Sequence, residues 1–84
     1  MHIDKDQIFA VLKANTLLIL SDVGANDVTI DGSLTDLGAN SIDRVEIVMN
    51  SLQELHLKIP VPELHGLKSL RAVVDLFYRY AAAQ

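Results

Sequence analysis

The chain has 84 residues, half of them hydrophobic, and contains no cysteine. We expect a single domain over residues 1–84, with too small a core to enclose a deep catalytic cavity, which argues against a self-sufficient enzyme. The absence of cysteine excludes disulfides, thiolate metal sites and cysteine nucleophiles. The histidines His2, His56 and His65 lie far apart in the sequence, so we expect exposed or half-buried side chains rather than a metal site.

The net charge of −4 is unevenly distributed. Residues 22–46 contain six acidic side chains and one basic side chain, Arg44, a balance of −5. This pattern favours a basic protein partner over nucleic acid, with a merely solvated acidic face as the alternative. No apolar run approaches the ~20 residues that span a bilayer, and the first residues lack the pattern of a signal peptide. We therefore expect no membrane association and a cytoplasmic location.

The first predicted helix runs from about Asp4 to Ile19, with Asp4 and Gln7 spaced as a capping box. Its apolar face comprises Ile8, Val11, Leu12, Leu18 and Ile19. Residues 21–32 show no helical period and predict a long loop, fixed to the core by Val28 and Ile30. A short turn follows, capped by Ser33 and ended by Gly38.

The second predicted helix runs from about Ser41 to Leu55. Its apolar stripe comprises Ile42, Val45, Met49, Leu52 and Leu55, with Met49 expected in the core. Prolines then favour a short third helix over about Pro62–His65, and Ile59 and Val61 beside it fit either the core or a surface rim. Ser69 caps the last helix, whose buried stripe comprises Leu70, Val73, Val74, Phe77 and Tyr80. The pattern predicts an all-α fold: an antiparallel four-helix bundle of three long helices and one short one, with a long loop after the first.

Ser41 is the residue whose position suggests chemistry. It lies in the first turn of the second predicted helix, where free backbone N–H groups and the helix dipole favour a phosphate. Asn40 and Asp43 supply oxygens that can cap the helix or approach a hard cation. No histidine or lysine lies within several residues, and a nucleophile elbow is absent, so another protein would have to activate Ser41. On the residues alone, an Asn-Ser helix cap without further function is the alternative.

The stretch Asp31-Gly32-Ser33-Leu34-Thr35-Asp36-Leu37-Gly38-Ala39-Asn40-Ser41-Ile42-Asp43-Arg44-Val45-Glu46-Ile47 resembles the attachment-site signature of acyl carrier proteins. The resemblance continues through Ile59-Pro60, Glu63-Leu64, residues 67–70 and residues 73–77, which are similar to the third and fourth helices of that family. It covers nearly the whole chain and is strongest over residues 33–77. The length and the acidic balance also agree with the family.

The resemblance implies that Ser41 carries a covalent 4′-phosphopantetheine arm. A phosphopantetheinyl transferase would transfer the arm from coenzyme A, and Mg²⁺ would take part only in that attachment. The arm ends in a thiol that carries acyl groups as thioesters, which supplies the chemistry that a chain without cysteine lacks. Tethering then raises the local concentration of the acyl group to about the mM range at a partner's active site.

Ile42, Val45 and Glu46 match the family pattern, whereas Asn40 replaces the usual aspartate before the serine. In the family that aspartate helps to hold Mg²⁺ during arm transfer; an amide oxygen can ligate Mg²⁺ without the charge. Arg44 places a positive charge on a face that is often wholly acidic in the family. We predict that partners contact the start of the second helix, through Ile42, Asp43, Arg44, Val45 and Glu46.

Residues 38–47 and Ile59-Pro60-Val61 are most similar to one subgroup, the free-standing donor carriers of polyketide β-branching cassettes. The resemblance implies a discrete, monomeric protein that donates acetyl to an HMG-CoA-synthase-like enzyme. An acyltransferase and a decarboxylating ketosynthase-like enzyme would supply that acetyl from malonyl. Three alternatives stay open: a generic polyketide or fatty-acid carrier, an unmodified helical interaction module, and a small hydrolase that uses Ser41 with His56 or His65.

Overall fold

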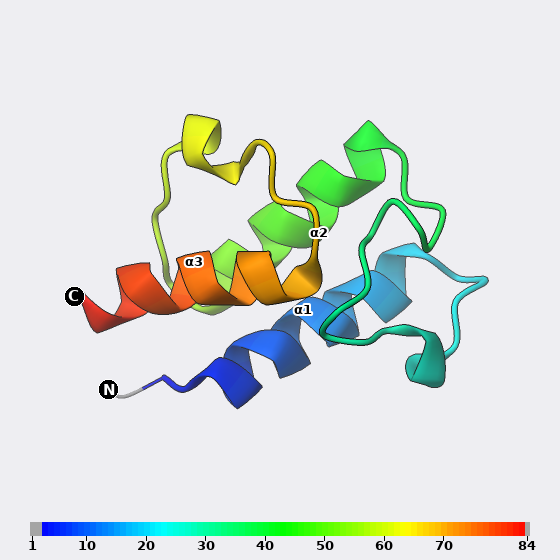
Figure 1. Ribbon diagram of the computed structural model, residues 1–84, viewed down its shortest axis with the longest axis horizontal. Helices are drawn as coiled ribbons and strands as arrows, with labels where there is room; N and C mark the ends of the chain where they lie inside the picture. Colours follow the sequence, from blue (N-terminus) through cyan, green and yellow to red (C-terminus); the bar gives the residue numbers. More distant parts are fainter. Residues whose placement is uncertain (1–2, 84) are drawn as a thin grey trace.

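The computed structural model describes residues 3–83 and contains three α-helices and two short 3-10 helices. In chain order these are α1 (Lys5–Ile19), η1 (Ala25–Asp27), α2 (Ser41–Glu54), η2 (Val61–Leu64) and α3 (Leu70–Ala82). In Figure 1, α1 runs away from the end of the molecule that holds both chain ends, and α2 and α3 run back toward it. The predicted all-α class is confirmed, since residues 3–83 contain no strand.

The predicted count of four helices in the bundle is not confirmed. The short third helix expected over about Pro62–His65 is the four-residue 3-10 helix η2, which Gly66 follows with a φ of 78°. The segment makes a single short turn, because the residue directly after it, His65, has an extended backbone with φ −78° and ψ 146°. The antiparallel relation holds between α1 and the other two α-helices (Figure 1), both of which contact α1.

The helix starts follow from local capping chemistry. Asp4 and Gln7 form the predicted capping box, because Asp4 Oδ1 accepts from Gln7 N at 2.8 Å and Gln7 Oε1 accepts from Asp4 N at 3.0 Å. Ser69 Oγ accepts from Ala72 N at 3.1 Å at the start of α3. These bonds satisfy backbone donors that have no partner inside their own helix.

One hydrophobic core joins the three α-helices and the long loop. Its buried members are Ile8 and Leu12 of α1, Val28, Leu34 and Ala39 of the loop, Ile47 and Leu52 of α2, Leu57 and Ile59, and Leu70, Val73, Val74, Leu76 and Phe77 of α3. The predicted stripe of α3 is confirmed for four residues, whereas Tyr80 is half-buried. The prediction for Leu18 is wrong, because 76% of this residue is exposed.

Helix α2 turns a different face to the core than its apolar stripe predicts. Ile47, Ser51 and Leu52 are buried, whereas Met49 is 45% exposed, so its predicted place in the core is wrong. Ser51 is buried without leaving its hydroxyl unpaired. The hydroxyl donates to Ile47 O at 2.7 Å and accepts from Asn15 Nδ2 at 3.2 Å. This polar contact joins α1 to α2, and of the predicted stripe Leu52 reaches the core while Ile42, Val45 and Met49 lie on the surface.

The long loop between α1 and α2 is attached to the start of α3. Leu70 N donates to Gly32 O at 2.9 Å and Arg71 N donates to Ile30 O at 2.8 Å, so loop carbonyls satisfy free donors of the α3 first turn. Arg71 Nε also pairs with Asp31 Oδ1 at 2.9 Å. Val28 is buried and Ile30 half-buried, as the sequence predicts. Two backbone hydrogen bonds and one ion pair therefore attach the loop that leads to Ser41 to the start of α3.

Among the helices formed by residues 3–83, none has the length and apolar character needed to cross a bilayer.

Candidate functional site

Ser41 is the first residue of α2, and its side chain is exposed. The chain contains four other serines, and three of them have structural roles in the described residues. Ser51 is buried, while Ser33 and Ser69 accept hydrogen bonds from the backbone N–H groups of residues 36 and 72. Ser21 lies in a turn after α1. Ser41 alone combines an exposed hydroxyl with the positive end of a long helix, which is the environment that suits a phosphate ester.

Asn40 and Asp43 flank Ser41 and bind each other. Asn40 Oδ1 accepts from Asp43 N at 2.8 Å, and Asp43 Oδ2 accepts from Asn40 N at 3.3 Å. The pair forms a capping box that fixes the backbone on both sides of Ser41. Both residues thus take the capping role that the sequence allowed. Within residues 3–83, no group of three or more His, Asp or Glu side chains is arranged to hold a metal ion.

Arg44 joins α2 to the turn that precedes it. Its Nη1 donates to Thr35 Oγ1 at 2.9 Å and to Ala39 O at 3.5 Å. Both acceptors come before Ser41 in the chain, so the guanidinium reaches back along α2 past the serine. Arg44 is half-buried in this position. The contact holds the start of the helix against residues 35–39, the turn that ends at Gly38 with a φ of 94°.

The remaining predicted partner residues differ in exposure. Ile42 is 69% exposed and Val45 is 60% exposed, which is unusual for large apolar side chains on one helix. Glu46 is exposed and Asp43 is half-buried. The start of α2 therefore presents apolar side chains and carboxylates together, beside Ser41.

A groove of about 770 Å³ is lined by Ser41 and lies between α2 and the segment from η2 to α3. One wall includes Arg44, Val45 and Met49 of α2, and the facing wall includes Val61, Leu64, His65, Leu67 and Lys68. Its walls are largely apolar, and Ser41 is one of its polar lining residues. Val45 and Met49, two exposed residues of the predicted stripe of α2, thus line this groove instead of entering the core.

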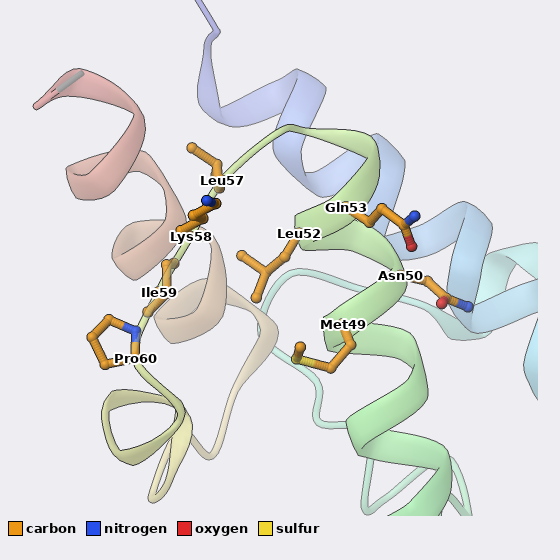
Figure 2. Close-up of a pocket in the computed structure, with 8 residues that line it drawn as sticks. All are labelled: Met49, Asn50, Leu52, Gln53, Leu57, Lys58, Ile59 and Pro60. Atoms are coloured by element: carbon orange, nitrogen blue, oxygen red, sulfur yellow. The ribbon is translucent and has the colours of Figure 1, made fainter.

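A second groove, of about 630 Å³, continues along the other half of α2 (Figure 2). Met49, Asn50, Leu52 and Gln53 line it from α2, and residues 57–60 line it from the facing segment. In Figure 2, Leu52 projects from α2 toward that segment. Met49 lines both grooves, so they meet at this residue.

Thr35 and Lys68 are among the groove residues that were not assigned to a site from the sequence. Thr35 precedes the helix by several residues, and its contact with Arg44 depends on the turn at Gly38. Lys68 comes from beyond η2 and carries no sequence signal for this site. His65, one of the two histidines considered as a partner of Ser41, lines the same groove, whereas His56 does not. His56 and His65 are both exposed, as predicted, while His2 lies outside the described residues.

The chain is similar to known proteins over most of its length. A family model described as "Phosphopantetheine attachment site" matches residues 18–77. The polyketide biosynthesis acyl-carrier-protein AcpK of Bacillus subtilis is 37% identical over 75 residues, which cover 89% of this chain and 92% of that protein. An acyl carrier protein of Clostridium perfringens is 35% identical over 54 residues, or 63% of this chain and 71% of that protein.

The fold also matches a solved structure. It is the crystal structure of the curacin biosynthetic pathway HMG synthase in complex with acetyl donor-ACP, in which one chain superimposes with a TM-score of 0.83. The two chains are 32% identical, and the match covers 92% of this chain and 99% of the other.

Proposed function

Because the chain belongs to the phosphopantetheine attachment-site family and is an acyl carrier protein, we propose that Ser41 is the residue that bears its arm. The family acts as a carrier and not as a catalyst, and its cofactor is covalently attached 4′-phosphopantetheine. The arm supplies a terminal thiol that holds acyl groups as thioesters. The single observation that carries the proposal is the exposed hydroxyl of Ser41 at the first turn of α2, in the lining of a groove.

Ser41 has no local base, so the transferase would have to activate its hydroxyl for attachment of the arm. The Ser41 oxygen would form a bond to the phosphorus next to the pantetheine of coenzyme A, and the pyrophosphate bond of coenzyme A would break. Adenosine 3′,5′-bisphosphate would leave, and the hydroxyl proton would pass to the phosphopantetheinyl transferase. Asn40 and Asp43 hold the backbone of Ser41 in place for this transfer. Mg²⁺ would belong to the transferase complex.

The surroundings of Ser41 fit such an arm. A phosphodiester is anionic, and Arg44, three residues along α2, lines the same groove as Ser41. The walls beyond it are formed by apolar residues such as Val45, Leu64 and Leu67, which suit the less polar length of pantetheine.

The acyl group we propose is acetyl, donated to an HMG-CoA-synthase-like enzyme during polyketide β-branching. The support is the similarity to a polyketide biosynthesis carrier and to an acetyl donor carrier in complex with an HMG synthase. An acyltransferase and a decarboxylating ketosynthase-like enzyme would supply acetyl from malonyl on the arm. The second candidate is a generic carrier, which the similarity to the acyl carrier protein of Clostridium perfringens favours.

We place the partner surface at the start of α2. Ile42 and Val45 are exposed apolar side chains beside Ser41, and Glu46 is an exposed carboxylate on the same helix. Such a surface combines apolar contact with charge steering, and it suits a brief encounter with a basic partner. Asp43 and Arg44 complete the set, although their side chains also hold the start of the helix.

The test is acetyl transfer followed by intact mass. The protein is loaded with an acetyl-phosphopantetheine arm, from acetyl-coenzyme A and a transferase, and then mixed with a β-branching HMG synthase. We expect the carrier to lose acetyl and the synthase to gain it, at a rate well above that of a fatty-acid carrier loaded in the same way. Equal rates for the two carriers would favour the generic role, and no transfer at all would contradict the donor role.

A further inference from the structure

The charged side chains that line the groove at Ser41 are both basic. They are Arg44 and Lys68, and no carboxylate lines the groove. This is unexpected in a chain with a net charge of −4, in which the acidic residues cluster around Ser41 in the sequence. Asp43 and Glu46 belong to the same helix but lie outside the groove lining. The groove is therefore a local basic site on an acidic protein, and it is suited to an anion.

Arg44 is the basic residue nearest to Ser41 along the helix. Residues three apart on an α-helix share a face, and side chains lean toward the N-terminus of the helix. The contacts of the Arg44 guanidinium with Thr35 and Ala39 show that it lies over the first turn of α2, where Ser41 begins the helix. Ser41 and Arg44 line the same groove, so a group attached to the Ser41 oxygen shares that groove with the guanidinium.

The guanidinium has donors available for an anion. Both of its hydrogen bonds within residues 3–83 are made by Nη1, to Thr35 Oγ1 and Ala39 O. A guanidinium carries five N–H donors in a planar fork, so Nε and Nη2 remain for another acceptor. The hydrogen bond to Thr35 orders the Arg44 side chain before any ligand binds. It uses one edge of the guanidinium and leaves the other edge free.

We propose that Arg44 binds the phosphodiester of the arm on Ser41 and holds the base of the arm in the groove. The inference rests on the proposed attachment at Ser41 and adds a positioning residue that acts after attachment. Thr35 orients Arg44, and the facing Lys68 adds positive potential from the other wall. A partner enzyme would then receive an arm whose first bonds are already directed along the groove.

The experiment uses the holo-protein, first shown by intact mass to carry one arm. The ³¹P resonance of the phosphodiester is compared with that of the same holo-protein unfolded in urea, which gives the unconstrained value. We expect the folded parent to differ from this value and Arg44→Gln to lose most of the difference. High salt should shift the parent toward the unfolded value, because exposed charge pairs are screened, and should leave Arg44→Gln unchanged.

Matched variants separate phosphate binding from a structural role. Lys58→Gln removes a basic residue that lines only the second groove, and it should keep the parent resonance. Thr35→Val removes the contact with Arg44 but leaves the charge, and it should also keep most of the ³¹P difference. Arg44→Lys should retain part of the difference, since a lysine offers the charge without the fork.

Two results would overturn the inference while leaving attachment at Ser41 intact. One is an Arg44→Gln holo-protein, folded by circular dichroism, with the ³¹P resonance of the parent. The other is a folded parent whose ³¹P resonance equals that of the urea-unfolded protein, which would show that no side chain constrains the phosphodiester. A parent that gains no arm would contradict the proposed function itself, and the inference with it.

Discussion

The side-chain oxygen of Asn40 accepts a 2.8 Å hydrogen bond from the backbone N–H of Asp43, so a single capping box spans Ser41 from one side to the other. The carboxylate of Asp43 completes it by accepting from Asn40 N. The two residues that the sequence places beside the candidate attachment site thus determine where α2 begins. The position of Ser41 depends on this cap.

Removing the cap should destabilise the fold. We expect Asn40→Ala to lower the free energy of unfolding by about 0.5–2 kcal/mol, because the N–H of Asp43 loses its acceptor. Asn40→Asp should keep the parent stability, since aspartate caps as well as asparagine does. Urea denaturation of the three proteins measures this directly. Equal stability for Asn40→Ala and the parent would contradict the role assigned to the cap.

The same position should influence arm attachment. An aspartate in place of Asn40 adds a negative charge next to Ser41, where family members hold Mg²⁺ during transfer. We expect Asn40→Asp to gain the arm several-fold faster than the parent with a broad-specificity transferase. Initial rates by intact mass, at several Mg²⁺ concentrations, provide the measurement. Identical rates and identical Mg²⁺ dependence would show that the amide serves as well as the carboxylate.

Glu46 should contribute to partner binding without supporting the fold. It is exposed on α2, so Glu46→Lys reverses a surface charge. We expect binding to an HMG synthase to weaken by about tenfold, mainly through slower association, with a smaller effect at high salt. Asp6→Lys, which reverses an exposed charge on α1, is the matched control and should bind as the parent does. An unchanged Kd for a folded Glu46→Lys would remove Glu46 from the partner surface.

The pair between Asp31 and Arg71 should make stability depend on pH. The hydrogen bond from Arg71, and then its positive charge, lower the pKa of the Asp31 carboxyl below its ordinary value. A lowered carboxyl pKa contributes stability above the ordinary value, near pH 4, and this contribution is lost as the pH falls through the folded-state pKa. We expect the parent to exceed Asp31→Asn in stability at pH 7 and to match it in strong acid.

Unfolding curves for these two proteins at pH 7 and at about pH 2 measure the difference. Added salt at pH 7 should also reduce it, because the pair is exposed. A difference that stays constant across this pH range would assign the effect of Asp31 to something other than its charge.

Local chemistry explains which parts of the fold could be predicted. The capping box of Asp4 and Gln7 and the cap at Ser69 depend on neighbours within three residues, so the helix starts were predicted closely. The cap of α2 at Asn40 follows the same rule, whereas attachment at Ser41 is a prediction from the resemblance to acyl carrier proteins and not from the local residues. The extent of η2 was not, because prolines mark an irregular segment without setting how many turns it makes.

The packing of the apolar face of α2 could not be predicted from the helical period of the sequence. Periodicity reveals that Ile42, Val45 and Met49 share a face, but it does not say whether that face meets the core or a groove. Ser51 reaches the core only because Asn15 of α1 and the carbonyl of Ile47 satisfy its hydroxyl. That contact joins residues far apart in the sequence. The contact of Arg44 with Thr35 likewise depends on the path of the loop.

The most direct test of the account is to locate the arm. The protein is incubated with coenzyme A, Mg²⁺ and a broad-specificity phosphopantetheinyl transferase, digested, and its peptides are fragmented by mass spectrometry. The account predicts a gain of one phosphopantetheine on Ser41 and none on the other four serines, with no gain in a folded Ser41→Ala variant. An arm on any other residue, or a gain that persists in Ser41→Ala, would contradict it.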